Sequence, residues 1–210
     1  ERADNFVLPS WITNLISALN VFFWLGSGNL NAALQWAQER GLGIDDKLDG
    51  LHEVEYIALA HILIAQNKLD EADQLLQRLI ENATVSDRVY MLIEMRLWRV
   101  LIFKLKADTA AALAELRLAL ALAEPGGFLM MFVSKGKPVA ELLEEILEVE
   151  KHDHDVTKAG FSLSYVKKIW SAFKTVMPPK IEGMMDPISE RELEVLHLIA
   201  AGLSNREIAE

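Results

Sequence analysis

The sequence predicts an all-α fold in which stacked helical hairpins are followed by a truncated helix-turn-helix. Apolar residues recur at helical spacing along most of the chain, and strand-like alternation is scarce. A polar turn followed by an alanine returns at Ala33, Ala72 and Ala112, at intervals of 39 and 40 residues. Near the C-terminus, two helix-capping patterns stand on either side of a glycine.

The repeated unit is a pair of helices. The first helices are expected at about 11–26, 51–66 and 88–105, and each leads through a polar turn into a second helix. One hairpin cannot bury its apolar face alone, so neighbouring hairpins pack on it, and alanine lets two helices approach closely. We therefore expect a superhelix similar to tetratricopeptide repeats, although their period of about 34 residues is shorter. A plain helical bundle with coincidental spacing is the alternative.

The sequence pattern changes after the third hairpin. Pro125 and two glycines should end the helix, and the apolar run 128–133 is expected to form a turn or short helix. Pro138 should open another helix, and a further amphipathic helix is expected near 162–176 after a polar loop. Residues 177–187 hold three prolines and a glycine, which is typical of a linker.

Composition limits the classes of function. The net charge is −10, and nucleic-acid affinity rests mainly on cations, so we expect no DNA contact by the chain as it stands. The chain has no cysteine, which excludes disulfides and thiolate metal sites and fits a cytoplasmic setting. No apolar run is long enough to span a membrane, and no membrane partner is expected. Because the first residue is Glu1, we interpret the chain as a fragment.

The segment 188–210 predicts the first half of a helix-turn-helix. Ser189 and Glu192 form a capping box, Gly202 ends the helix, and Ser204 with Glu207 opens another one. The segment resembles the start of the LuxR-type DNA-binding domain, with Ser189 in place of the usual threonine and Ile188 in place of leucine. The matching residues are Arg191, Glu192, Glu194, Val195, Leu196, Leu198, Ala200, Gly202, Ser204, Asn205, Glu207, Ile208 and Ala209.

The resemblance implies a third, recognition helix that enters the major groove, and we expect it to be missing from this fragment. Without it the fragment should not read DNA, because base contacts come from that helix. Ser204, Asn205 and Arg206 are expected to contact the DNA backbone in the intact domain, since they lie at a helix N-terminus. The alternative is that Ser204 only caps its helix and the other two side chains are solvated.

The segment 123–143 resembles the boundary after the last repeat of large, MalT-like LuxR-type regulators. In these regulators an ATPase module precedes the repeats, and the repeats bind the inducer. The resemblance implies a sensor or interaction domain at 1–176, a linker at 177–187 and a truncated helix-turn-helix at 188–210. ATP is expected only in a missing N-terminal module, and no cofactor in this fragment, because no G-x-x-x-x-G-K-[ST] motif occurs.

No enzyme is predicted. The chain has neither a G-x-S-x-G nor an H-E-x-x-H motif, so no catalytic residue is proposed. The tract 152–155 (His-Asp-His-Asp) carries side chains that can bind metal. Adjacent residues in a polar loop rarely face one ion, so we expect a solvated loop and no metal site.

A binding surface is the more plausible site, because stacked hairpins form a concave face lined by the first helix of each pair. We predict that Phe22, His61, Glu94 and Lys104 lie on this face and contact a small effector or a peptide. The alternative is that these are residues at the edge of the core, satisfied by their neighbours. Trp24, Trp36, Tyr56 and Trp98 are interpreted as packing residues.

Two hypotheses about function follow. In the first, the chain is part of a DNA-binding transcription regulator, and its repeats sense an inducer or regulate activity. DNA is then a partner of the full-length protein and not of this fragment. In the second, the repeats are a scaffold that binds a partner protein and no small ligand. A closed pocket with mixed polar and aromatic walls would favour the first hypothesis, and an open groove the second.

Overall fold

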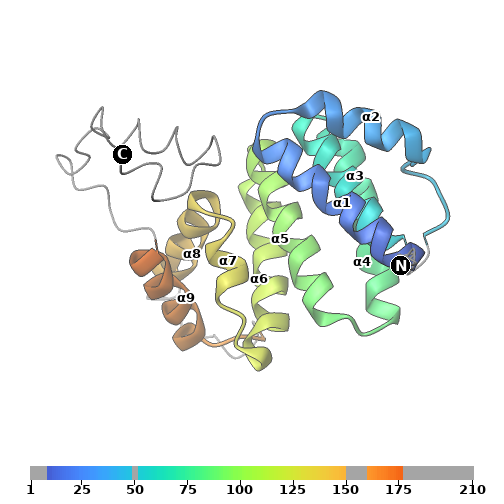
Figure 1. Cartoon of the computed structure of the whole chain (residues 1–210). Helices are drawn as coiled ribbons and strands as arrows, with labels where there is room; N and C mark the ends of the chain where they lie inside the picture. The colour runs from blue at the N-terminus through green and yellow to red at the C-terminus, as the bar shows by residue number, and fades with distance from the viewer. Residues whose placement is uncertain (1–8, 49–51, 150–159, 177–210) are drawn as a thin grey trace, which may run out of the picture. The chain divides into compact units, whose positions relative to one another are not determined.

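The computed structural model describes residues 9–48, 52–149 and 160–176, and within these ranges the regular secondary structure is helical throughout. Six helices form three successive hairpins (Figure 1). The helices are α1 (Ser10–Gly26) and α2 (Leu30–Arg40), α3 (Glu53–Ala65) and α4 (Leu69–Val85), and α5 (Val89–Leu105) and α6 (Thr109–Ala123). The predicted all-α class and the three first helices are confirmed, with bounds that differ by at most two residues at either end.

The alanines that set the predicted register occupy equivalent places. Ala33, Ala72 and Ala112 are all completely buried, each near the start of the second helix of its hairpin. A side chain larger than a methyl group would separate the helices that cross there. The periodic alanines therefore mark the close contacts of the stack, as the sequence predicts.

The hairpin turns repeat as well. Gly28, Asn67 and Ala107 have φ angles of 77°, 60° and 58°, in the left-handed region. In each turn the backbone N–H of this residue and of the next one bond back to carbonyls of the first helix; those of Gly28 and Asn29, for example, reach Leu25 and Trp24. This arrangement ends a helix without orphaned carbonyls. Glycine and asparagine suit the left-handed conformation, whereas alanine is strained in it.

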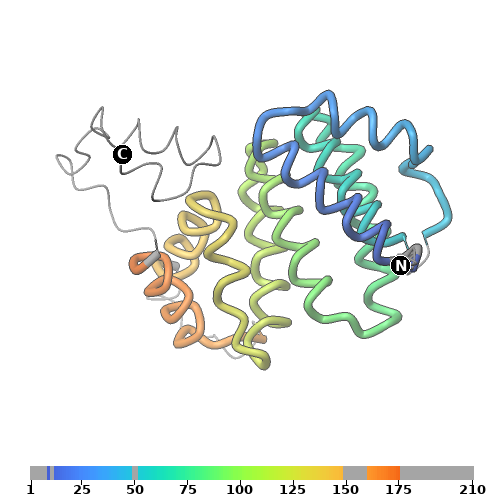
Figure 2. The backbone as a smooth tube through the Cα atoms, in the orientation of Figure 1, coloured from blue at the N-terminus to red at the C-terminus, as the bar shows by residue number. Residues whose placement is uncertain are grey.

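Successive helices pack along the stack, as the tube in Figure 2 shows. Helix α1 contacts α2 and α3, α3 contacts α4, α4 contacts α5, and α5 contacts α6. The first two hairpins enclose one apolar core, and a second core joins α5 and α6 to the helices that follow. The cores meet at α5, whose Leu92 and Met95 belong to the first and Ile93 and Leu97 to the second.

An ion-pair network ties the second and third hairpins together. Glu115 of α6, almost fully buried, bonds Arg96 and Arg99 of α5 at 2.8 and 2.6 Å. Arg99 also bonds Asp73 and Gln77 of α4 at 2.7 and 2.6 Å. Partly buried charges are tolerated because each finds an opposite charge or a hydrogen-bond partner.

The chain continues from α6 into a 3-10 turn (η1, Glu124–Gly126), then α7 (Met130–Val133), α8 (Lys137–Val149) and α9 (Leu163–Val176). This confirms the break after the third hairpin, the short helix within 128–133, the helix at Pro138 and the one near 162–176. Polar contacts attach the start of α9 to η1. Glu124 accepts hydrogen bonds from the backbone N–H and the hydroxyl of Ser162, and the Tyr165 hydroxyl donates to the Phe128 carbonyl at 2.7 Å.

Several predicted segments lie outside the described residues. These are most of the polar loop (150–159), the linker (177–187) and the helix-turn-helix (188–210), with the residues predicted to contact DNA, Ser204, Asn205 and Arg206. Among the residues that the structure describes, no helix is both long and apolar enough to cross a membrane.

Candidate effector-binding face

The first helices of the three hairpins carry a stack of rings. Phe22 of α1 meets His61 of α3 edge to face, with ring centroids 4.7 Å apart. His61 in turn lies against Trp98 of α5, with centroids 3.8 Å apart and planes inclined by 53°. Because the three residues follow one another at 39 and 37 positions, the repeat itself brings them together.

Trp98 connects this stack to a partly buried ion pair. Its indole N–H donates to Glu94, one turn earlier on α5, at 2.9 Å. Glu94 also pairs with Lys135, which follows α7, and the Lys135 ammonium lies 4.6 Å from the centre of the Trp98 ring. Only 7% of the Lys135 side chain is exposed, so its charge is stabilised by the carboxylate and the aromatic face rather than by water.

A cavity of about 350 Å³, which is open to solvent, lies beside the ring stack. Phe22, Leu25 and Gly26 of α1, His61, Ile64 and Ala65 of α3, and Trp98 of α5 line it. No acidic or basic side chain other than His61 belongs to this lining. The surface is therefore apolar and aromatic, with one imidazole.

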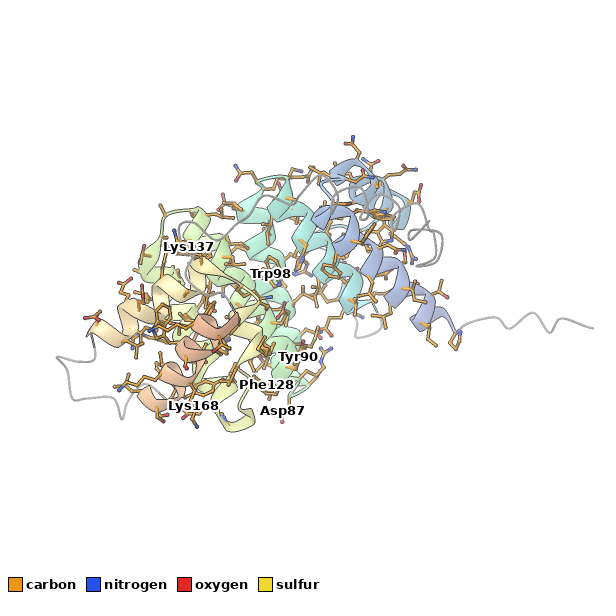
Figure 3. All side chains as sticks on the ribbon, turned by 60° about the vertical axis from the view of Figure 1, so that its left-hand side comes forward. Asp87, Tyr90, Trp98, Phe128, Lys137 and Lys168 are labelled. Carbon is orange, nitrogen blue, oxygen red and sulfur yellow. The ribbon has the colours of Figure 1, made fainter. Side chains whose placement is uncertain are left out.

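A second hollow, of about 570 Å³, lies between α5 and α7, and Glu94 and Lys135 form part of its lining. Tyr90 and Phe128 meet in it with ring centroids 6.2 Å apart, and Figure 3 shows these two side chains close together. Leu129, Met130, Met131 and Ser134 complete its walls. Tyr90 and Met130 are more than half exposed, so this hollow is an open groove whose walls are mainly apolar but include the Glu94–Lys135 ion pair.

His61 is neutral in this environment. Burial, reinforced by the charge of Lys135, lowers the pKa of His61 to about 3. Its Nε2 atom is covered and has no hydrogen-bond partner among the described residues. A buried polar atom of this kind costs free energy until a partner reaches it.

The four residues predicted for the concave face separate into two groups. Phe22, His61 and Glu94 belong to one connected set, joined through Trp98. Lys104 lies apart and pairs with Glu141 of α8 at 3.1 Å. Sequence reasoning did not assign Trp98 or Lys135 to the site. The 37-residue step from His61 to Trp98 is a signal for the first, but no pattern indicates that Lys135 returns to α5.

The tract 152–155 lies outside the described residues, so its expected lack of a metal site stays a prediction. Among the residues that are described, no cluster of His, Cys, Asp or Glu side chains has the arrangement of a metal site.

A comparison with known protein families identifies the family to which these repeats belong. The family model "MalT-like TPR region" matches residues 1–149, which include all three hairpins and continue to the end of α8. The chain belongs to this family. The MalT-like TPR match confirms the tetratricopeptide-like repeat, in place of a bundle with coincidental spacing. A second model, "Bacterial regulatory proteins, luxR family", matches residues 186–210, which confirms the resemblance of the C-terminal segment.

Individual relatives agree with both matches. The chain is 28% identical to the HTH-type transcriptional regulator MalT of Serratia proteamaculans over 95% of its length and 23% of that protein's length. The same identity and coverage hold for the proteins of that name in Yersinia enterocolitica and Yersinia pestis. The chain thus spans about a quarter of the length of these relatives. No solved structure matches.

Proposed function

We propose that this chain is part of a transcription regulator of the MalT and LuxR type, in which the helical repeats receive a small effector and control a C-terminal DNA-binding domain. The proposed division is a sensor domain at 1–176, a linker at 177–187 and a helix-turn-helix segment at 188–210. The family matches at 1–149 and 186–210 support the pairing of a repeat region with a DNA-binding region.

One observation carries the sensor part of the proposal. The cavity of about 350 Å³ is lined by all three first helices, and its single imidazole has an unpartnered nitrogen. Ligand sites are concave, mostly apolar and fitted with few polar groups, and they range from about 300 to 1,000 Å³. Because one ligand would touch three hairpins, its binding would favour one relative arrangement of the repeats over others.

DNA binding belongs to the full-length regulator in this proposal. Ser204, Asn205 and Arg206 would contact phosphates at the start of a helix. The test is a gel-shift measurement with the full-length protein and Asn205→Ala, whose loss of affinity should be similar on all DNA sequences. A loss confined to one base pair of the site would contradict the backbone role.

The effector role is tested by thermal unfolding of the chain in the presence of a panel of metabolites and oligosaccharides. A ligand at about 100 times its Kd adds about 2.7 kcal/mol to the free energy of unfolding. For a domain of this size, that raises Tm by roughly 5 to 10 °C. The proposal fails if no compound raises Tm while the chain is shown to be folded.

A scaffold function is the second candidate, and exposed apolar surface favours it. Ile16, Leu19 and Phe23 form a stripe on α1 and are 48%, 52% and 73% exposed. The Tyr90–Phe128 groove and the α1–α3–α5 cavity are also both open to solvent, as the scaffold hypothesis predicts. Contiguous apolar surface of this kind marks contact sites for other proteins. Under this alternative, Phe23→Glu would abolish binding of a partner and Ala65→Trp, at the rim of the cavity, would not.

A further inference from the structure

The polar groups around the α1–α3–α5 cavity are nearly all engaged. The indole N–H of Trp98 is bonded to Glu94, and the ammonium group of Lys135 is paired with the same carboxylate. The remaining walls are hydrocarbon or aromatic. His61 Nε2 is the one atom of the lining side chains that is buried without a hydrogen-bond partner in the described part of the chain.

The lining of the cavity also disfavours charged ligands. His61 is neutral, and the nearest cation, Lys135, already has its carboxylate. A charged ligand would lose its hydration here without gaining a counter-ion, which is costly in an apolar site. A molecule with several hydroxyl groups would meet a similar difficulty, because most of its hydroxyls would find no partner.

The shape of the cavity also favours a small, flat ligand. Phe22 and Trp98 present rings from two sides of His61, and aromatic rings favour edge-to-face or offset stacking with flat partners. A volume of about 350 Å³ is small among ligand sites, which fits a compact ring system.

We propose that the α1–α3–α5 cavity binds a small, uncharged, mainly aromatic molecule with one polar group, which hydrogen-bonds to His61. This inference rests on the proposed effector role and names the chemical class of the effector. Because Nε2 is covered, pairing requires a turn of the imidazole ring within the stack. The ring is thus both the recognition group and the part that moves when the cavity fills.

The experiment is an NMR titration of the whole chain with probes of one size that differ in polarity. Indole offers a hydrogen-bond donor, quinoline offers an acceptor and is neutral at pH 7.5, and 1-methylindole keeps the shape of indole without its donor. Indole-3-carboxylate supplies a charge, and sucrose supplies many hydroxyls. The readouts are the Kd of each probe and the side-chain nitrogen resonances of His61.

Two variants locate the binding. Ala65 is exposed at the rim, so Ala65→Trp should fill the cavity without disturbing the core, and Ala114→Trp adds the same side chain to an exposed place on α6 as a control. We expect indole or quinoline to bind, Ala65→Trp to abolish binding, and Ala114→Trp to leave it unchanged. His61→Phe should raise the Kd of the probe that binds about fivefold, as the loss of one hydrogen bond predicts. The His61 nitrogen resonances should shift on binding.

The outcomes distinguish this inference from the function on which it rests. If indole-3-carboxylate or sucrose binds more tightly than the neutral probes, and Ala65→Trp abolishes that binding, the effector role stands and the ligand class is wrong. If indole and 1-methylindole bind equally and quinoline does not bind, the His61 hydrogen bond is refuted. If no probe binds and the metabolite panel is also flat, both the ligand class and the effector role are refuted.

Discussion

At the scale of single residues, the environment of a side chain changes what the residue type can do. A solvated histidine titrates near pH 6.5, but His61 is buried between Phe22 and Trp98, and both this burial and the charge of Lys135 disfavour the protonated ring. Ala107 is a comparable case in the backbone, since it adopts a left-handed conformation that its methyl group resists.

The lowered pKa of His61 makes a prediction about acid stability. Below pH 6.5 the unfolded chain binds a proton at this residue and the folded chain does not until about pH 3, so stability falls as the pH falls through this window. Relative to His61→Phe, the protein should lose up to about 1.4 kcal/mol of unfolding free energy per pH unit below 6.5. Urea unfolding of both proteins at pH 7.5 and pH 5 measures this. A His61 resonance that titrates near pH 6 would contradict it.

The strain at Ala107 predicts a stabilising substitution. Ala107→Gly should raise the free energy of unfolding by up to about 1 kcal/mol, because glycine tolerates a φ of 58° without steric cost. Ala114→Gly, in the interior of α6, is the matched control and should lower it by about 0.5 to 1 kcal/mol. Thermal unfolding of the two variants compares them. Equal destabilisation by both would show that the turn is not strained.

At the scale of helices, the hairpins are held by side chains that reach across them. The Glu115 carboxylate on α6 joins two arginines of α5, and one of these continues to Asp73 on α4. At the other end of the stack, Arg40 of α2 bonds the buried Glu55 of α3 at 2.7 Å. These bonds fix which face of each helix points inward, which apolar packing alone specifies weakly.

The Glu115 network predicts a large cost for removing its centre. Glu115→Ala leaves two partly buried guanidinium groups without their shared partner, so we expect a loss of about 3 kcal/mol or more. Asp70→Asn is the control, because the Lys106–Asp70 pair has the same charges on an Asp side chain that is 91% exposed, and no measurable loss is expected. Denaturant unfolding tests both. Similar midpoints for the two variants would refute the structural role of Glu115.

At the scale of the whole repeat region, the loss of stability caused by a packing defect should depend on which hairpin carries the defect. In a solenoid each unit contacts only its neighbours, so a central hairpin has two interfaces and a terminal one has fewer. Here the second hairpin lies between the first and the third. Defects at equivalent alanines should therefore differ in cost according to their position.

Ala72→Leu and Ala33→Leu test this gradient, since both alanines are completely buried at equivalent helix crossings. Overpacking costs about 1 to 3 kcal/mol, and we expect Ala72→Leu to lower Tm more than Ala33→Leu. Hydrogen exchange should show that Ala33→Leu exposes mainly α1 and α2, whereas Ala72→Leu loosens all three hairpins. Equal effects throughout would mean that the region unfolds as one unit.

The sequence by itself determined the helical class, the three hairpins and the positions where helices begin and end. The reason is that helical periodicity, capping residues and the alanines that recur at intervals of 39 and 40 residues act locally and repeat, so each copy supports the interpretation of the next. The same periodicity placed Phe22 and His61 on one face. The C-terminal match to the luxR family was also predictable, because its motif is continuous in sequence.

Only the tertiary structure decided which side chains meet around the candidate site. Lys135 is 37 residues beyond Trp98 and outside the hairpins, and it reaches Trp98 and Glu94 because the chain turns back after η1 and packs α7 against α5. Lys104, predicted for the same face as Glu94, lies about three turns further along α5, where it pairs with Glu141. Contacts of this kind depend on how helices cross, and no local pattern encodes a crossing. The neutrality of His61 and the cavity beside it have the same origin, since both arise from packing between helices.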